Sequence, residues 1–243
     1  GGAERSMLML AAGFDQCGYR VDMVVMRAGG ALEGLLPASI RLINLRTPRI
    51  RSVPAALRRY LRQARPARVL ANMWPLTVAA VLARGPGWGR AGPEVCVIDH
   101  APLSLAYRDR GAGHRLALRL SLLVAYRAAA WRVGVSEGVC ADLARLSGLE
   151  PARFHAIANP IRAPEAPLVA LRRDSRQSES ETRTTARAAW NQPEDDSGAR
   201  ILSVGALKPV KNHALLLHAC APLLRAGTAT LLILGEGELR PQL

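Results

Sequence analysis

Lysine is almost absent from this chain of 243 residues. Of its 33 Lys and Arg residues only Lys208 and Lys211 are lysines, and both lie in one short loop. Aromatic residues make up only 4% of the chain, so aliphatic side chains and alanine must fill its core. No apolar run reaches the roughly 18 residues that a membrane span needs, since Arg119 and Arg127 interrupt the nearest one, residues 116–130. These absences argue against a membrane-spanning helix and direct attention to the lysine loop.

Cysteine and histidine are too few and too dispersed for a metal site or a disulfide framework. The four cysteines form no CxxC pair, and they are typical of buried small apolar residues in a reducing compartment. His213 and His218 are five residues apart, which is a poor spacing for one helix face. We therefore expect no metal site and a cytoplasmic protein.

The formal net charge is +14, which raises the question of a polyanionic partner. Arginine is spread along the whole chain without a concentrated basic run or interleaved aromatic residues, so we expect no nucleic-acid partner. A basic surface would nevertheless favour anionic lipid headgroups and anionic donor substrates. An anionic membrane surface therefore remains a candidate partner.

Strand and helix patterns alternate along most of the chain, which predicts an α/β fold with parallel sheets covered on both faces. Residues 1–162 form the first expected domain, and residues 200–243 begin a second one with the same alternation. The segment between them, 163–199, is rich in Ser, Thr, Glu and Arg and buries little apolar surface, so we expect a flexible linker or insertion. The helix expected at 113–130 is apolar on most of its circumference, which favours a buried scaffold helix over one that lies against a membrane.

The lysine loop has the pattern of a diphosphate site. The apolar run Ile201–Val204 predicts a strand, Gly205 ends it, and an apolar-periodic helix begins just after Lys211. A strand, a short loop and a helix N-terminus commonly hold a diphosphate, and lysine supplies a compact charge for a phosphate oxygen. The alternative is a surface turn in which two lysines occur by chance.

Four further segments, in order along the chain, resemble one family. They are GGAER (1–5), VIDHAPLS (97–104), VSEGV (135–139) with ANPI (158–161), and LGEG (234–237) with LRPQL (239–243). Together with the Lys211 loop they are similar to the retaining GT-B glycosyltransferases of the large family-four group. The resemblance implies two Rossmann-like domains, the second incomplete here, and sugar transfer from a UDP-, GDP- or similar nucleotide-sugar without a metal or cofactor. It also implies a sugar or lipid-linked acceptor, in polysaccharide or glycolipid biosynthesis, and a peripheral position at the inner face of the membrane.

The resemblance also assigns candidate site residues. His100 would contact the transferred sugar as the catalytic candidate, although a histidine that caps the next loop is the alternative. The donor-binding candidates are Gly1, Gly2, Gly205, Lys211, Gly235 and Glu236. The family often carries an arginine directly after the loop glycine, and here that position is Ala206, so Lys208 is the candidate for a second cationic contact.

The ends of the chain depart from the family pattern. The family has a strand before the GGAER loop and an acidic E-x7-E pair well beyond LRPQL, and this sequence contains neither. We therefore expect a fragment cut at both ends, and we assign no residue to the acidic pair. The alternative function is a non-catalytic basic module, or an inactive enzyme fragment, that binds anionic membrane or nucleic acid.

Overall fold

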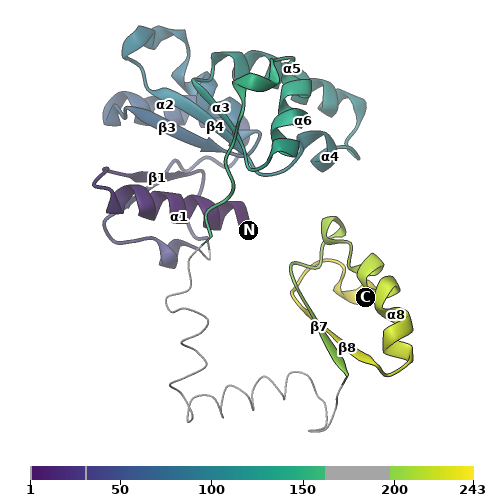
Figure 1. The fold of residues 1–243 in the computed structure, drawn as a ribbon. Coiled ribbons are helices and arrows are strands. Elements are labelled where there is room, and N and C mark those ends of the chain that lie inside the picture. The colour runs from purple at the N-terminus through teal and green to yellow at the C-terminus, as the bar shows by residue number, and fades with distance from the viewer. Residues whose placement is uncertain (1, 31, 162–197) are drawn as a thin grey trace. The chain divides into compact units, whose positions relative to one another are not determined.

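A computed structural model describes residues 2–30, 32–161 and 198–243, and its contacts divide the chain into two units, Gly1–Ala163 and Pro164–Leu243. Figure 1 shows the fold of the described residues. The linker or insertion expected at 163–199 lies almost wholly outside the described residues, as does Gly1.

The first unit contains two parallel sheets. One pairs β1 (Asp22–Val25) with β2 (Arg41–Asn44). The other has the order β3-β4-β5-β6, with bounds Arg68–Asn72, Glu94–Asp99, Trp131–Gly134 and His155–Ala156. Side chains near the first sheet, including Val24 and Leu45, pack against the core of the second. The expected α/β fold with parallel sheets is thus confirmed.

The helix α1 (Gly2–Gln16) precedes β1, and a short 3₁₀ turn, η1 (Glu33–Leu35), lies between β1 and β2. Helices lie between the later parallel strands, as parallel connections commonly require. They are α2 (Val53–Ala64), α3 (Leu76–Arg84), α4 (Leu103–Ala106), α5 (Ala112–Ala128) and α6 (Glu137–Ser147). Figure 1 shows α5 and α6 beside each other. The core is mostly aliphatic, and its most deeply buried members include Leu61, Val97, Leu122, Tyr126 and Leu143.

Local sequence explains where the helices begin and end. The Ser136 hydroxyl accepts a hydrogen bond from the Val139 amide and caps α6, as its position in the sequence predicts. Gly148 ends the same helix in the left-handed region, with φ of 64°. Pro54 lies in the first turn of α2, and Pro66 follows its end.

Within residues 198–243, the second unit has one two-stranded parallel sheet and one long helix. The strands are β7 (Ala199–Val204) and β8 (Ala229–Leu234), and α8 (His213–Arg225) connects them. A short 3₁₀ turn, η6 (Pro209–Lys211), lies between β7 and α8, and a second, η7 (Arg240–Gln242), follows β8. This is a single β-α-β connection, and it places the lysine loop at the carboxyl end of β7.

Two expectations about burial are wrong. Cys140 and Cys220 are buried, but Cys17 is exposed on the turn that follows α1, and all four cysteines are free. The helix expected at 113–130 is α5, and it is only partly a buried scaffold, because large aliphatic side chains also cover its outer face. Composition alone could not distinguish these two apolar faces of α5.

Candidate functional site

The His100 side chain lies directly after β4, at the carboxyl end of the four-stranded sheet. Its Nε2 is 2.6 Å from the Oδ1 atom of Asn72, the last residue of the neighbouring strand β3. Because an amide oxygen can only accept, Nε2 carries the proton and Nδ1 presents a lone pair. Nδ1 is itself buried and has no hydrogen-bond partner among the described residues.

The ionisation of His100 is set by its surroundings. Burial lowers the pKa of His100, and the side chain of Asn159 raises it by a smaller amount. Asn159 therefore lies close to the imidazole, although no well-aligned hydrogen bond reaches Nδ1. A neutral ring bracketed by Asn72 and Asn159 is suited to exchange hydrogen bonds with a hydroxyl, and unsuited to hold a permanent charge.

Asp99 precedes His100 and points the other way, into the core. Its Oδ1 accepts the backbone N–H of Trp74 at 3.0 Å, and its Oδ2 accepts the hydroxyl of Tyr126. Burial raises the pKa of Asp99 to about 6, and the hydrogen bonds from Tyr126 and Trp74 lower it in part. Neighbouring residues of a strand face opposite sides of the sheet. Asp99 therefore bonds to groups in the core, whereas the His100 side chain lies beside Asn72.

The lysine loop of the second unit brings Gly205 and Lys211 together. The Lys211 stem folds across Gly205, because a Cβ placed on that glycine would lie 3.8–3.9 Å from three of its side-chain carbons. No hydrogen-bond or ion-pair partner is recorded for the Lys211 ammonium within 198–243, and its side chain is exposed. An exposed lysine whose stem crosses a glycine at a strand end is an arrangement that can receive a phosphate.

The loop after β8 packs directly against the lysine loop. A Cβ on Gly235 would overlap the carbonyl oxygen of Gly205, and one on Gly237 would overlap that of Leu207. The Leu207 amide donates to the Glu236 carbonyl at 3.0 Å, which joins the two loops. Gly235 is thus required for loop packing, whereas ordinary contact distances would accommodate a methyl group on Gly205.

Glu236 is engaged within its own loop. Its carboxylate pairs with the Arg240 guanidinium four residues later, in the short turn η7, and both side chains are exposed. This pairing agrees with a carboxylate that shapes the loop. A bound ligand would have to compete with Arg240 for it.

The N-terminal glycines and α8 complete the set of candidate residues. Gly2 begins α1, where its carbonyl accepts the Ser6 hydroxyl at 3.1 Å, and a Cβ there would meet nothing within 4 Å.

His213, the first residue of α8, is buried, and its Nε2 lies 3.3 Å from the Ala206 carbonyl, which ties the lysine loop to the helix.

Sequence reasoning missed three of the groups that build these sites. Asn72 and Tyr126 carry no motif. The register of β3 beside β4 brings Asn72 to His100, and the packing of α5 in the core brings Tyr126 to Asp99. Asn159 lies in the ANPI segment that carries part of the resemblance and was not among the candidate site residues, yet it lies close to His100. The available signal was the position of Asn159 just after the last strand of the parallel alternation, because the carboxyl ends of parallel strands meet at one sheet edge.

Neither a metal cluster nor a bilayer-spanning helix is found in the described parts of the chain. No three His, Cys, Asp or Glu side chains gather there in a way that could hold a metal ion. None of the helices described is both long and apolar enough to cross a membrane.

Comparison with known proteins supplies two kinds of match. The family model of glycosyltransferase family 4 matches residues 1–163. No curated protein matches the chain.

The fold is similar to solved structures that are far apart from it in sequence. A glycosyltransferase from Rickettsia africae ESF-5 matches with a TM-score of 0.61 at 15% identity, over 99% of this chain and 58% of its own. The catalytic domain of starch synthase IV from Arabidopsis thaliana, bound to ADP and acarbose, matches with a TM-score of 0.51 at 14% identity, over 77% of this chain and 47% of its own. The chain thus spans about half the length of these solved proteins.

Proposed function

The chain belongs to glycosyltransferase family 4, and we propose that it transfers a sugar from a nucleoside-diphosphate donor to a hydroxyl acceptor with retention of anomeric configuration. The observation that carries the proposal is Lys211, whose stem lies over Gly205 at the carboxyl end of β7 and whose exposed ammonium has no partner within residues 198–243. Ligands of open α/β sheets bind at this end of the strands. The starch synthase to which the chain is similar was solved with ADP, a nucleoside diphosphate.

Lys211 would stabilise the negative charge that develops on the departing diphosphate. Fixed cations and N–H groups aimed at a developing charge supply much of the rate enhancement in such reactions. In this proposal the half-buried Gly205 and the exposed Ala206 allow a phosphate to approach the backbone closely. The loop after β8 holds this loop in shape through the packing of Gly235.

His100 would contact the sugar or the acceptor hydroxyl. Because Nε2 donates to Asn72, the neutral ring has a free lone pair on Nδ1, which accepts a hydroxyl hydrogen bond once the side chain shifts toward a ligand. Gly2, at the start of α1, would contact the donor or the acceptor, and Gly1 belongs to the same expectation from the family. The nucleotide base, the sugar and a lipid-linked or polysaccharide acceptor belong to this proposal as expectations from the family.

The test is a transfer assay on the full chain with UDP-glucose, GDP-mannose and ADP-glucose as separate donors and with simple glycoside acceptors. We expect one donor to be consumed and ¹H NMR to show a product with the donor's α configuration. Lys211→Ala should lower kcat/KM by about 10- to 100-fold, as expected for loss of a charged hydrogen bond worth roughly 1.5–3 kcal/mol.

Arg225→Ala is the matched control, because it removes one positive charge from the opposite end of α8. It should leave kcat/KM nearly unchanged. A β-configured product would contradict the retaining reaction. Equal losses for Lys211→Ala and Arg225→Ala would favour a basic module that attracts anions through its net charge.

A further inference from the structure

A hollow of about 140 Å³ lies between α2 and η3 (Pro86–Ala91), the short 3₁₀ turn that precedes β4. It is lined by Arg58, Arg62, Gly87 and Trp88. The strands β3 and β4 are parallel, and they begin at the same edge of the sheet, just after α2 and η3 respectively. The hollow therefore lies at the sheet edge opposite to His100, and the six residues of β4 set the two roughly 20 Å apart.

Two glycines allow the walls of this hollow to pack closely. The Arg58 Nε donates to the Ala83 carbonyl at 2.9 Å, and a Cβ on Gly85 would overlap the Arg58 guanidinium. A Cβ on Gly92 would likewise overlap the Trp88 side chain, which packs against the core. Arg58 and Trp88 are thus held in place before any ligand binds.

The turn η3 is itself held by Arg84, the last residue of α3. The Arg84 Nε donates to the Pro93 carbonyl at 3.1 Å, and its Nη2 donates to the Gly89 carbonyl at 3.1 Å. These bonds occupy the Arg84 guanidinium with the backbone of the turn. The guanidiniums that line the hollow are therefore those of Arg58 and Arg62.

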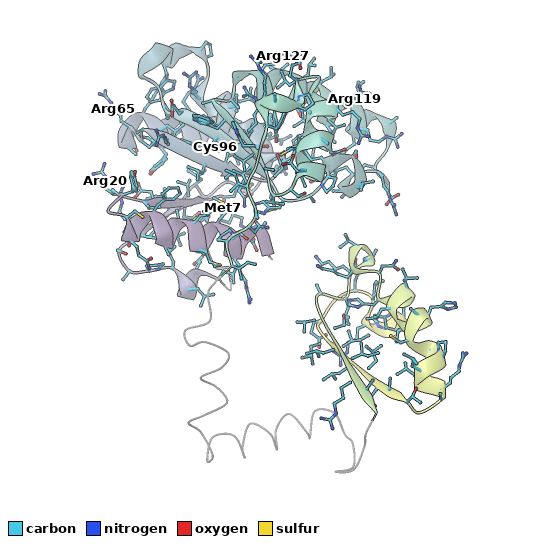
Figure 2. All side chains as sticks on the ribbon, in the orientation of Figure 1. Met7, Arg20, Arg65, Cys96, Arg119 and Arg127 are labelled. Carbon is cyan, nitrogen blue, oxygen red and sulfur yellow. The ribbon has the colours of Figure 1, made fainter. Side chains whose placement is uncertain are left out.

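The positive charge along α2 has no counterpart in the described parts of the chain. The helix and the residue after it contain four arginines and no acidic residue, a formal charge of +4, and Figure 2 labels the last of them, Arg65. Arg62 is exposed and has no hydrogen-bond or ion-pair partner among the described residues, whereas Glu94 pairs with Arg68 at 3.2 Å. Like charges four residues apart on a helix repel each other. An anion bound to both arginines of the hollow would relieve that repulsion.

We propose that this hollow binds the phosphoryl group of a soluble phosphate monoester between the guanidiniums of Arg58 and Arg62 and beside Trp88. A phosphoryl group carries nearly two negative charges and three acceptor oxygens, which suit two guanidinium forks. A cavity of about 150 Å³ holds a molecule the size of benzene, whereas a ligand as large as a nucleotide needs roughly 300 Å³ or more. The hollow therefore fits the phosphoryl group with part of its ester, and the rest of the ligand extends into solvent.

The chemistry of the hollow favours this ligand over other anions. A nucleic-acid strand needs a basic groove with several aromatic rings for successive bases, and the hollow offers one ring and two guanidiniums. A single carboxylate would neutralise only one of the two guanidiniums. The Lys211 loop belongs to the other unit of the chain, so the inference does not depend on sugar transfer.

A ¹H–¹⁵N NMR titration of the full chain with phenyl phosphate, at constant ionic strength, tests the proposal. We expect saturable shifts of the Trp88 indole N–H, the Arg58 Nε–H and the Gly87 amide. Arg62→Ala should weaken the binding by about 10-fold or more, because it removes a charged hydrogen bond. The matched control is Arg59→Ala, which removes the same charge from an exposed arginine of α2 that does not line the hollow. It should weaken the binding by about twofold or less, because exposed charges are screened.

Three further titrations separate the contributions to binding. Inorganic phosphate should shift the same signals with lower affinity, since it has no ring to pack on Trp88. Arg62→Gln keeps most of the side-chain stem, and it should repeat the loss seen for Arg62→Ala because the guanidinium is what binds. Lys211→Ala should leave the affinity of the hollow for phenyl phosphate unchanged.

Three results would overturn the proposal. The first is an equal loss of affinity in Arg62→Ala and Arg59→Ala, which would mean that the net charge of α2 alone attracts the anion. The second is a set of shifts confined to residues 198–243, which would place the phenyl phosphate in the other unit. The third is the absence of any shift at the hollow when phenyl phosphate reaches millimolar concentrations.

Discussion

At the scale of single residues, Asp99 and His100 illustrate how one strand end serves two purposes. Asp99 is nearly inaccessible to solvent and takes hydrogen bonds from Trp74 and Tyr126, whereas His100 contacts Asn72. Strand alternation correctly predicts that the two side chains do not pair. It could not predict Tyr126 or Asn72 as partners, because those contacts depend on packing between elements far apart in the sequence.

Asp99 gives the chain a pH-dependent stability of unusual sign for a carboxyl group. Burial raises the pKa of Asp99 from 3.8 to about 6, so the folded state holds its proton to a higher pH than the unfolded state does. The stabilisation of the folded state that Asp99 contributes is therefore fully present below about pH 4, and it is lost as the pH rises through about 6. Asp99→Asn should remove this loss, which amounts to roughly 3 kcal/mol for about two pKa units.

Urea titrations of the full chain and of Asp99→Asn at pH 4, 5, 6 and 7 measure the effect. An asparagine can still accept from the Trp74 amide, and Tyr126 can turn its own proton toward Thr77, which is 3.3 Å away. We therefore expect the variant to gain stability relative to the unaltered chain as the pH rises. A constant difference at all four pH values would mean that Asp99 does not titrate there.

At the scale of elements, the two loops of the second unit depend on glycine for different reasons. Gly235 has the Gly205 carbonyl oxygen in the place of its missing Cβ, whereas Gly205 has only the flexible Lys211 stem at ordinary contact distance. Gly235→Ala should destabilise the second unit by roughly 1–3 kcal/mol because the loops must separate. Gly205→Ala should cost much less.

Amide hydrogen exchange of β7 and β8 in the full chain distinguishes these two variants. Faster exchange throughout both strands is expected for Gly235→Ala, and near-unchanged protection for Gly205→Ala. Equal acceleration in both variants would show that Gly205 is also required for packing. Its proposed role in admitting a phosphate would then lose its basis.

Most elements could be predicted from the sequence, and the misses have physical reasons. The alternation of strands and helices, the Ser136 cap and the strand–loop–helix around Lys211 are local patterns, and the structure reproduces them. The short helix α4 was missed because four residues show no periodicity, and a distant side chain, Asp142, anchors it through the Ser104 amide. The outer face of α5 was missed because apolar residues surround the helix.

At the scale of the whole molecule, the dispersed arginines behind the net charge of +14 compete with the Lys211 loop for anions. Dispersed arginines attract nucleotides weakly, and the attraction falls steeply with salt. The Lys211 loop should instead bind a diphosphate through a few directed contacts, which survive better at raised salt. Local motifs identify the family, but only the folded loops show that Lys211 lies over Gly205.

A ¹H–¹⁵N NMR titration of the full chain with UDP, GDP and ADP, at low and raised salt, tests this account most directly. We predict shifts confined to the amides of Gly205, Ala206, Lys211 and the first turn of α8, persisting at raised salt and lost in Lys211→Ala. Shifts scattered over arginine-bearing surfaces, abolished by salt and unchanged in Lys211→Ala, would contradict the proposed donor site.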